Sequence, residues 1–222
     1  MTRTTYDFKL ASGSPRRQEL LEIAGWRPFL NPVKIEEKPN LSEDPLSFAK
    51  RLALEKAEKS AGLDGMIVLG ADTIVILGDQ ILGKPEDDRH AEFMLEALCG
   101  KVHQVITAIA IVDPGHDRFL VDTCITDVPM RVFNPNEIKS YIAAGSPLDK
   151  AGAYGIQDVE FHPVNLDKMD GCFANVMGLP LCHLERALKS VGLVTPENIY
   201  IKCMEHTKYN CQVYQRILQR EI

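Results

Sequence analysis

The chain has 222 residues, of which 45% are hydrophobic, so it can bury one substantial core, and disorder is excluded as a description of the whole. The formal net charge of -6 at pH 7 argues against a general nucleic-acid binder, so any positive surface should be local and suited to a small anion. The six cysteines form no CxxC pair, no secretory signal is visible at residues 1–5, and no apolar run is long enough to cross a membrane. These features predict a cytoplasmic protein with reduced thiols.

The octet Leu10–Arg17 joins a short apolar strand, a small-residue loop and the start of a helix. Ser14 is a good N-cap, Pro15 suits the first helical position, and Gly25 can end the helix. Free N–H groups and the positive end of the helix dipole favour an anion at such an end. The side chains that gather there are Ser12, Ser14, Arg16 and Arg17. The octet predicts a phosphate site, although a capped helix with its arginines in water fits it equally well.

After this helix, short apolar runs alternate with helical patterns, and this rhythm predicts an α/β fold. An irregular stretch is expected over 31–41, because it holds two prolines. A Gly-Asp turn at 78–79 predicts a hairpin, and an Asn-Pro-x-Glu sequence at 134–137 predicts a capping box. The expected elements, in chain order, are a helix over 45–61, strands over 66–77 and 80–82, a helix over 88–98, strands over 105–112 and 119–128, and helices over 134–145 and 180–192.

Asp72 interrupts an otherwise apolar strand at 66–77. An ionised carboxylate left unpaired there would cost several kcal/mol, so we expect it to meet a cation, a metal or hydrogen-bond donors. A structural aspartate that caps a bulge at Gly70 is the alternative. Lys56 falls within the apolar face of the preceding helix, so its ammonium should point toward the interior or the rim of a cleft, unless it reaches past that face to solvent.

Three further positions are candidates for a site. Lys84 follows a short strand and lies between Gly83 and Pro85, although an ordinary turn lysine fits that setting too. Of the adjacent acids Glu36 and Glu37, at most one should face a site on the sheet. The small-residue loop over 149–157 ends in Gln157, whose amide could read the donor and acceptor edge of a ligand. The loop could equally be a tight connection that needs glycine for its backbone angles.

Together these motifs resemble the Maf proteins, nucleotide pyrophosphatases that are distantly related to the inosine-triphosphate pyrophosphatases. The resemblance extends from about Leu10 to Val191, and its motifs arrive in the family order. They are Leu10–Arg17, Arg51–Ala57, Gly70–Thr73, Gly83–Pro85, Ala151–Gln157 and Asn175–Pro180.

The resemblance implies an elongated α/β fold in which a mixed sheet with flanking helices forms two lobes around a central cleft, usually within a homodimer. It also implies cleavage of a nucleoside triphosphate to the monophosphate and pyrophosphate with Mg²⁺ or Mn²⁺. Glu37 and Asp72 are the candidates for binding that ion, which prefers hard oxygen ligands. The family usually gives the position of Asp72 the role of base, but the residues leave open whether Asp72 or the metal activates the water. The side chains expected to neutralise the triphosphate are Arg16 or Arg17, Lys56 and Lys84.

Arg16, Thr73 and Gln157 match the subgroup of the family that acts on dTTP and UTP, including modified uridine nucleotides. An amide and a hydroxyl can pair with the O4 and N3–H edge of uracil or thymine. A pyrophosphatase for purine or 7-methylguanosine triphosphates is one alternative. A nucleotide-sensing regulator of cell division without turnover is another, and the intact Asp72, Lys56 and Lys84 count against it.

The chain departs from the family pattern in two places. Ala108 and Asp158 stand where the family usually has glycine, so the loop geometry near them is not fixed by the resemblance. We expect a pyrophosphatase domain over 1–194 and an extension over 195–222. The extension has apolar residues at helical spacing, which predicts an amphipathic helix that docks on the body or on a second subunit. Those residues are Tyr209, Val213, Ile217 and Leu218.

Overall fold

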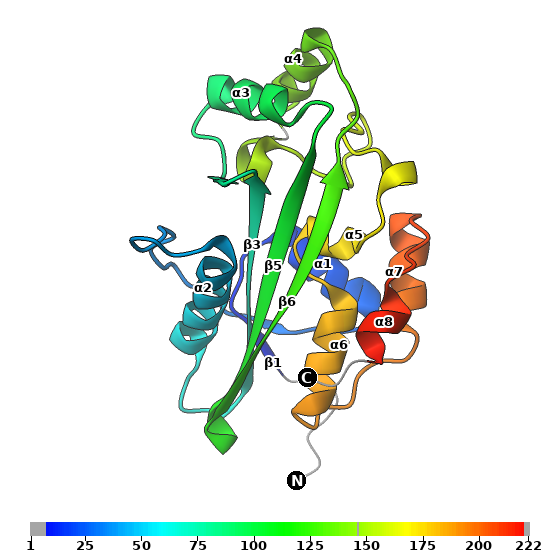
Figure 1. The fold of residues 1–222 in the computed structure, drawn as a ribbon. Coiled ribbons are helices and arrows are strands. Elements are labelled where there is room, and N and C mark those ends of the chain that lie inside the picture. The colour runs from blue at the N-terminus through cyan, green and yellow to red at the C-terminus, as the bar shows by residue number, and fades with distance from the viewer. Residues whose placement is uncertain (1–7, 146, 220–222) are drawn as a thin grey trace.

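The computed structural model describes residues 8–145 and 147–219, and the residues 1–5 that bear on a secretory signal lie outside it. Its centre is a six-stranded mixed sheet in the order β2-β1-β3-β5-β6, with β4 paired to β3 (Figure 1). β1 pairs in parallel with β2 and β3, whereas β3, β4, β5 and β6 form antiparallel pairs. The strands are β1 (Phe8–Leu10), β2 (Phe29–Leu30), β3 (Ile67–Leu77), β4 (Gln80–Leu82), β5 (Val102–Asp113) and β6 (Arg118–Pro129).

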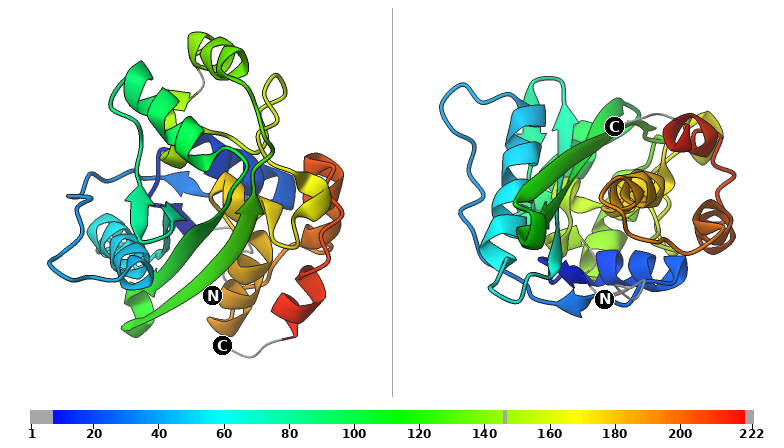
Figure 2. Two further views of the ribbon diagram at one scale, coloured as in Figure 1. Left: turned by 45° about the horizontal axis from the view of Figure 1, so that its top comes forward. Right: turned by 90° about the horizontal axis from the view of Figure 1, so that it is seen from below.

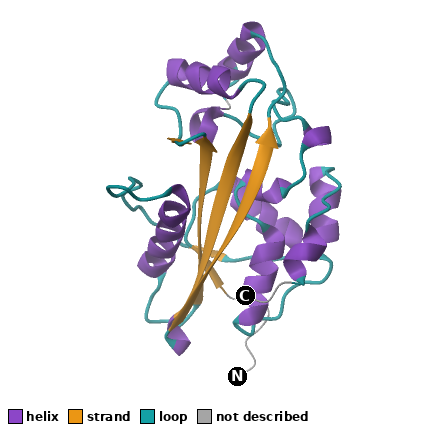
Figure 3. Cartoon of the chain, viewed as in Figure 1, coloured by secondary structure: helices purple, strands orange, loops and turns teal. Residues whose placement is uncertain are grey.

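Helices lie on both faces of the sheet and at one end of its long strands (Figure 3). Seen along the strands, α2 covers one face and α6 the other, with α1, α7 and α8 on the side of α6 (Figure 2). The helices are α1 (Pro15–Ala24), α2 (Pro45–Ser60), α3 (Asp88–Leu98), α4 (Pro135–Ala143), α5 (Phe173–Met177), α6 (Leu181–Ser190), α7 (Ile199–Thr207) and α8 (Tyr214–Leu218). The predicted α/β class, with a mixed sheet and flanking helices, is confirmed.

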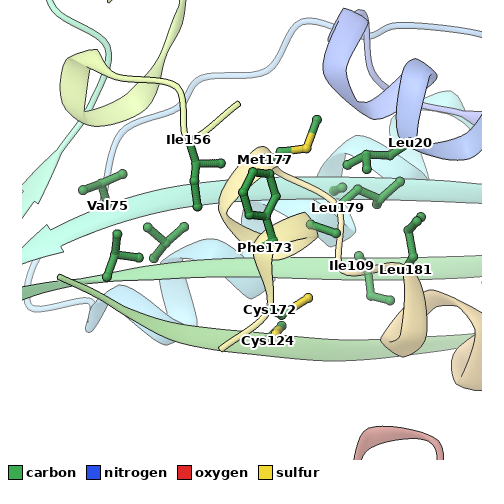
Figure 4. Close-up of a cluster of buried hydrophobic side chains, with 14 of the residues drawn as sticks. Leu20, Val75, Ile109, Cys124, Ile156, Cys172, Phe173, Met177, Leu179 and Leu181 are labelled. Atoms are coloured by element: carbon green, nitrogen blue, oxygen red, sulfur yellow. The ribbon is translucent and has the colours of Figure 1, made fainter. Parts of the chain in front are cut away.

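Alternation along the long strands sends their side chains into two separate cores. Val68 and Ile106 belong to a smaller core under α2, while Leu69 and Ile109 belong to a larger core on the opposite face. In the larger core, Figure 4 shows Phe173 and Met177 of α5 beside Leu179 and near the strand residue Ile109. This packing fixes α5 and the turn that follows it against the sheet.

Local sequence signals account for most of the helix ends. The capping box at α4 is present, because Asn134 Oδ1 accepts from the backbone N–H of Glu137 while Glu137 accepts from that of Asn134. α1 begins after Ser14 and ends at Gly25, whose φ of 98° is in the left-handed region. The strands β5 and β6 are longer than predicted, because their pairing continues at both ends, from Val102 with Pro129 to Asp113 with Arg118.

Gly70 allows α2 to approach the sheet closely. It pairs regularly with Ala110, so the alternative of a bulge at this glycine is wrong. A Cβ at Gly70 would lie 2.1 Å from the carbonyl oxygen of Ala53, which no real side chain could tolerate. The close contact brings Lys56, one turn further along α2, next to Asp72, two residues further along β3.

The described part of the C-terminal extension forms two helices, α7 and α8, and only α8 falls within residues 209–218, where the helical spacing was found. Lys208, with a φ of 54°, ends α7, and non-helical residues separate it from α8. α7 docks on α1 through Lys202, whose ammonium donates to the Ala24 carbonyl over 3.4 Å. α8 is held on α6, because Arg186 Nη1 donates to the Ile217 carbonyl over 3.0 Å. The described part of the extension therefore packs on the body of the protein; residues 220–222 lie outside it.

All six cysteines are free thiols. Over residues 8–145 and 147–219, none of the helices combines the length and the apolar character needed to cross a membrane.

Candidate active site

A cavity of about 400 Å³ lies between the loop before α1, the middle of β3, and the loop that follows α4. It is lined by residues far apart in the sequence, which the parallel pairing of β1 with β3 and the close contact of α2 bring together. Every predicted site residue lines this cavity. They are Ser12, Ser14, Arg16, Arg17, Glu37, Lys56, Asp72, Thr73, Lys84 and Gln157.

Lys56 joins the two predicted acids. Its ammonium nitrogen lies 2.6 Å from Asp72 Oδ1 and 2.6 Å from Glu37 Oε1. Lys56 and Asp72 are buried, with 8% and 6% of their surface exposed, so the alternative in which Lys56 reaches solvent is wrong. Glu36 faces outward and pairs with Lys38, as expected if only one of the adjacent acids serves the site.

The electrostatic surroundings keep Glu37 ionised. Partial burial acts to raise the pKa of its carboxyl group, but the hydrogen bond from Lys56 and the charges of Lys56, Lys84 and Arg17 outweigh it, and the pKa is lowered. Glu37 comes from the irregular segment after β2, and it lines the same cavity as Asp72 of β3. Two carboxylates from different segments, Glu37 and Asp72, thus contact the same ammonium, that of Lys56.

Arg17 is partly buried, and its guanidinium donates hydrogen bonds to three groups. Its Nε donates to the Gly178 carbonyl over 2.9 Å, Nη1 to Ser12 Oγ over 3.0 Å, and Nη2 to Thr73 Oγ1 over 3.1 Å. Burial lowers the pKa of the Arg17 guanidinium, and the nearby Asp72 carboxylate opposes this shift. The result is a cation fixed at the N-terminal end of α1.

Arg16 points toward the rim. Its Nη1 donates to Asp149 Oδ2 over 2.7 Å. Ser14 occupies the N-cap position but its side chain makes no capping hydrogen bond, while its backbone N–H donates to Ser12 Oγ over 3.2 Å. The first turn of α1 therefore faces the cavity with its N-terminal end uncapped by Ser14, as an anion site requires.

Lys84 enters the cavity from the turn after β4. Within the described ranges, no hydrogen bond or ion pair engages its ammonium, which leaves this cation available to an anionic ligand. The turn itself is tied to the opposite loop, because the Gly152 N–H donates to the Gly83 carbonyl over 3.0 Å.

A layer of hydrogen bonds behind Arg17 was missed from the sequence. Thr73 Oγ1 lies 2.9 Å from Thr107 Oγ1, and Thr107 donates to the Asn175 carbonyl over 3.0 Å. Asn175 is fully buried and donates from Nδ2 to Val105 O and to Thr126 Oγ1. These bonds fix α5 and therefore the Gly178 carbonyl that receives Arg17. The motif containing Asn175 was visible in the sequence, but nothing local indicated which groups it would meet.

The loop after α4 closes the other side of the cavity. Tyr154 OH lies 2.7 Å from His103 Nε2, and Gly152, with a φ of 69°, packs against Val75. Of the two departures from the family pattern, Ala108 continues β5 in regular register with Asp72. Asp158 ends the loop, and its carboxylate accepts a hydrogen bond from Gln157 Nε2 at 3.2 Å.

Comparison with known proteins agrees with these motifs. A family profile described as "Maf-like protein" matches residues 7–191. The chain is 45% identical over 184 residues to a dTTP/UTP pyrophosphatase of a Geobacter species, an alignment that covers 82% of this chain and 94% of that protein. It is 40% identical over 200 residues to a dTTP/UTP pyrophosphatase of Pasteurella multocida, covering 86% of this chain and 98% of the relative.

Among solved structures, a HAM1 protein from Coxiella burnetii aligns with 56% of this chain and 73% of its own, at 18% identity and a TM-score of 0.40.

Proposed function

This chain belongs to the Maf-like protein family, and on that premise we propose that it hydrolyses nucleoside triphosphates, dTTP and UTP in particular, to the nucleoside monophosphate and pyrophosphate. The observation that carries the proposal is the meeting of Lys56, Asp72 and Glu37 in the cavity that also receives Arg17. Hydrolysis at the α-phosphorus of a nucleotide needs both kinds of group, since cations must bind the phosphates while a carboxylate accepts the proton of the attacking water.

The cations suit a polyphosphate chain. A triphosphate carries several negative charges, and no water can approach its α-phosphorus until they are neutralised. We assign that neutralisation to Arg17, Lys84 and Lys56, with the backbone N–H groups at the start of α1. Ser12 and Ser14 add hydroxyl groups beside the same helix end. Arg17 is already held in place by hydrogen bonds, so little rotamer freedom is lost when it binds phosphate.

The acids suit a divalent cation. Glu37 and Asp72 offer carboxylate oxygens, the hard ligands that Mg²⁺ or Mn²⁺ takes in proteins. Both carboxylates contact the positively charged ammonium of Lys56, so this part of the cavity already binds a cation. We propose that these two residues hold the ion, with the remaining ligand positions left to water and phosphate oxygens. When bound, the ion supplies further neutralisation of the polyphosphate.

Asp72 is our candidate for the general base. In this step a water attacks the α-phosphorus, the bond to the bridging oxygen breaks, the water's proton passes to Asp72, and pyrophosphate leaves. Lys56 keeps the Asp72 carboxylate oriented through the 2.6 Å contact. Burial of Asp72 limits its other partners to those that line the cavity.

Gln157 and Thr73 are our candidates for reading the base. A glutamine amide offers an NH₂ group that donates and an oxygen that accepts, which matches the O4 and N3–H edge of uracil and thymine. Arg16, held by Asp149 at the rim, lies on the same side of the cavity as this loop. We further propose, as the family resemblance implies, that the enzyme acts in the cytoplasm as a homodimer; sedimentation velocity on the purified protein tests the second point.

The test is a panel of nucleoside triphosphates incubated with the purified protein and Mg²⁺, with release of pyrophosphate as the readout. Faster release from dTTP and UTP than from the other nucleotides supports the proposal. Faster release of pyrophosphate from 7-methylguanosine triphosphate or a purine nucleotide would show that the enzyme prefers that base. Binding without any turnover would indicate a nucleotide sensor instead.

A further inference from the structure

Asp158 contacts the side chain that is proposed to read the base. Its carboxylate accepts from Gln157 Nε2 through Oδ1 at 3.2 Å and from the hydroxyl of Tyr141 through Oδ2. The Lys150 ammonium lies 3.6 Å from Oδ2. With only 16% of its side chain exposed, this carboxylate is packed behind Gln157, which lines the cavity, rather than being a solvated loop acid.

The contact with Asp158 decides which way the Gln157 amide faces. An ionised carboxylate can only accept hydrogen bonds, so the amide NH₂ must turn toward it. The amide oxygen and the second N–H of Gln157 then remain for a ligand. If the amide were reversed, its oxygen would meet the carboxylate oxygen of Asp158, and two acceptors with no proton between them repel one another.

Amide orientation is what separates uracil from cytosine. Uracil and thymine present an acceptor at O4 and a donor at N3–H, whereas cytosine presents a donor at its amino group and an acceptor at N3. A glutamine amide that can rotate by half a turn matches either edge equally well. Only a glutamine that is held in one orientation can distinguish the two bases.

We propose that Asp158 is a specificity-determining positioning residue, which holds the Gln157 amide in the orientation that accepts from N3–H and donates to O4, and so excludes cytosine. This rests on the proposed function, in which Gln157 reads the base. Asp158 itself acts through Gln157.

The surroundings hold the Asp158 carboxylate in place. The ring of Tyr141, 4% exposed, stacks on Phe161 with centroids 4.4 Å apart, and its hydroxyl also accepts the Gly155 N–H over 3.1 Å. A Cβ at Gly155 would lie 2.6 Å from Asp158 Oδ1, so only glycine leaves room for the carboxylate there. Because the Asp158 carboxylate is held in one position, it holds the Gln157 amide in one orientation.

The experiment compares kcat/KM for UTP and CTP in the wild type, Asp158→Asn and Asp158→Gly. Asparagine keeps the shape but can donate as well as accept, so both orientations of Gln157 become allowed; glycine removes the contact. We expect the UTP to CTP ratio to fall by about tenfold or more in both variants, with kcat/KM for CTP rising. Asp127→Asn is the matched control, because Asp127 accepts from the Gln104 amide at 2.9 Å on the exposed sheet surface, and its ratio should not change.

A ratio that stays constant while both substrates slow down equally would show that Asp158 is only structural, and would overturn the proposal. If neither Asp158 variant folds, Tyr141→Phe decides, since it removes one donor to the carboxylate and should lower the ratio by a smaller factor; an unchanged ratio would again overturn the proposal. A wild type without activity on UTP would refute the proposed function itself, which the first measurement shows before any variant is compared.

Discussion

The ammonium of Lys56 lies 2.6 Å from Asp72 Oδ1 and 2.6 Å from Glu37 Oε1, so one buried cation joins an acid on the central strand to an acid in an irregular segment. The contact follows from the close approach of α2 to β3 at Gly70. Removing either partner of such a buried pair leaves a charge without compensation, so the three residues should be studied with isosteric substitutions first.

Asp72→Asn should keep the fold, because asparagine has the same shape and can still meet Lys56. Turnover of dTTP should fall by ~10² or more, the usual scale for removal of a general base. Steady-state pyrophosphate release, with circular dichroism to verify the fold, measures this. Glu36→Gln is the control, since Glu36 lies on the surface beside Glu37, and its turnover should match the wild type. A folded Asp72→Asn enzyme with normal turnover would eliminate Asp72 as base.

Lys84→Ala should raise KM and lower kcat together, because an ammonium that has no partner among the described residues can bind phosphate in both the ground state and the transition state. Lys101→Ala, at an exposed position after α3, serves as the control for loss of one positive charge. Full substrate titrations with dTTP provide both constants. If kcat/KM is the same in Lys84→Ala and the wild type, Lys84 is an ordinary turn residue and does not bind phosphate.

Gln157→Ala should reduce the preference for dTTP and UTP over CTP and 7-methylguanosine triphosphate, because the cavity loses the amide that pairs with the base edge. Discrimination in the wild type could reach ~10² or more, since the wrong edge leaves buried polar groups unpaired. The measurement is kcat/KM for the four substrates in both proteins. Selectivity that survives the substitution would place base recognition on other residues.

The sequence predicted the elements with strong local signals. α3 and α4 formed where caps and helical periodicity placed them, and Asp72 and Lys56 met because each broke the apolar pattern around it. α5 was missed because five residues are too few to show periodicity. Its role depends on Asn175 and Thr107, which come together only through the sheet.

Two other features depended on tertiary context. The helical spacing from Tyr209 to Leu218 predicted one helix, but only Tyr214–Leu218 of that run is helical, and α7 lies before it in the chain. The contact between Asp158 and Gln157 had no sequence signal either, since adjacent side chains meet only when the backbone turns between them. Here the Asp158 N–H donates to the Gly155 carbonyl and closes that turn.

Ile199→Ala should destabilise the protein, because Ile199 is fully buried where α7 packs on the body. Truncation of a buried isoleucine costs about 2–5 kcal/mol of unfolding free energy. Ile201→Ala, at a position 37% exposed on the same helix, should cost much less. Urea unfolding of both variants measures the difference; equal values would show that α7 contributes little to the stability of the core.

The stability of the protein should depend on pH through His103, which is buried, with Nε2 at Tyr154 OH and Nδ1 without a hydrogen-bond partner among the described residues. Burial lowers the pKa of His103 from its ordinary value of 6.5 to about 4. Between these values the unfolded chain binds a proton that the folded protein does not, so stability is complete above pH 6.5 and is lost as the pH falls toward 4.

From pH 7 to pH 5 this linkage should remove about 2 kcal/mol of the unfolding free energy. Urea unfolding at the two pH values measures the loss, and in His103→Gln it should be smaller by that amount, because glutamine does not titrate. His162→Gln, at an exposed histidine, should retain the wild-type dependence. The same loss in His103→Gln as in the wild type would mean that His103 accepts its proton in the folded state, and that the cavity wall around Tyr154 can accommodate a charge.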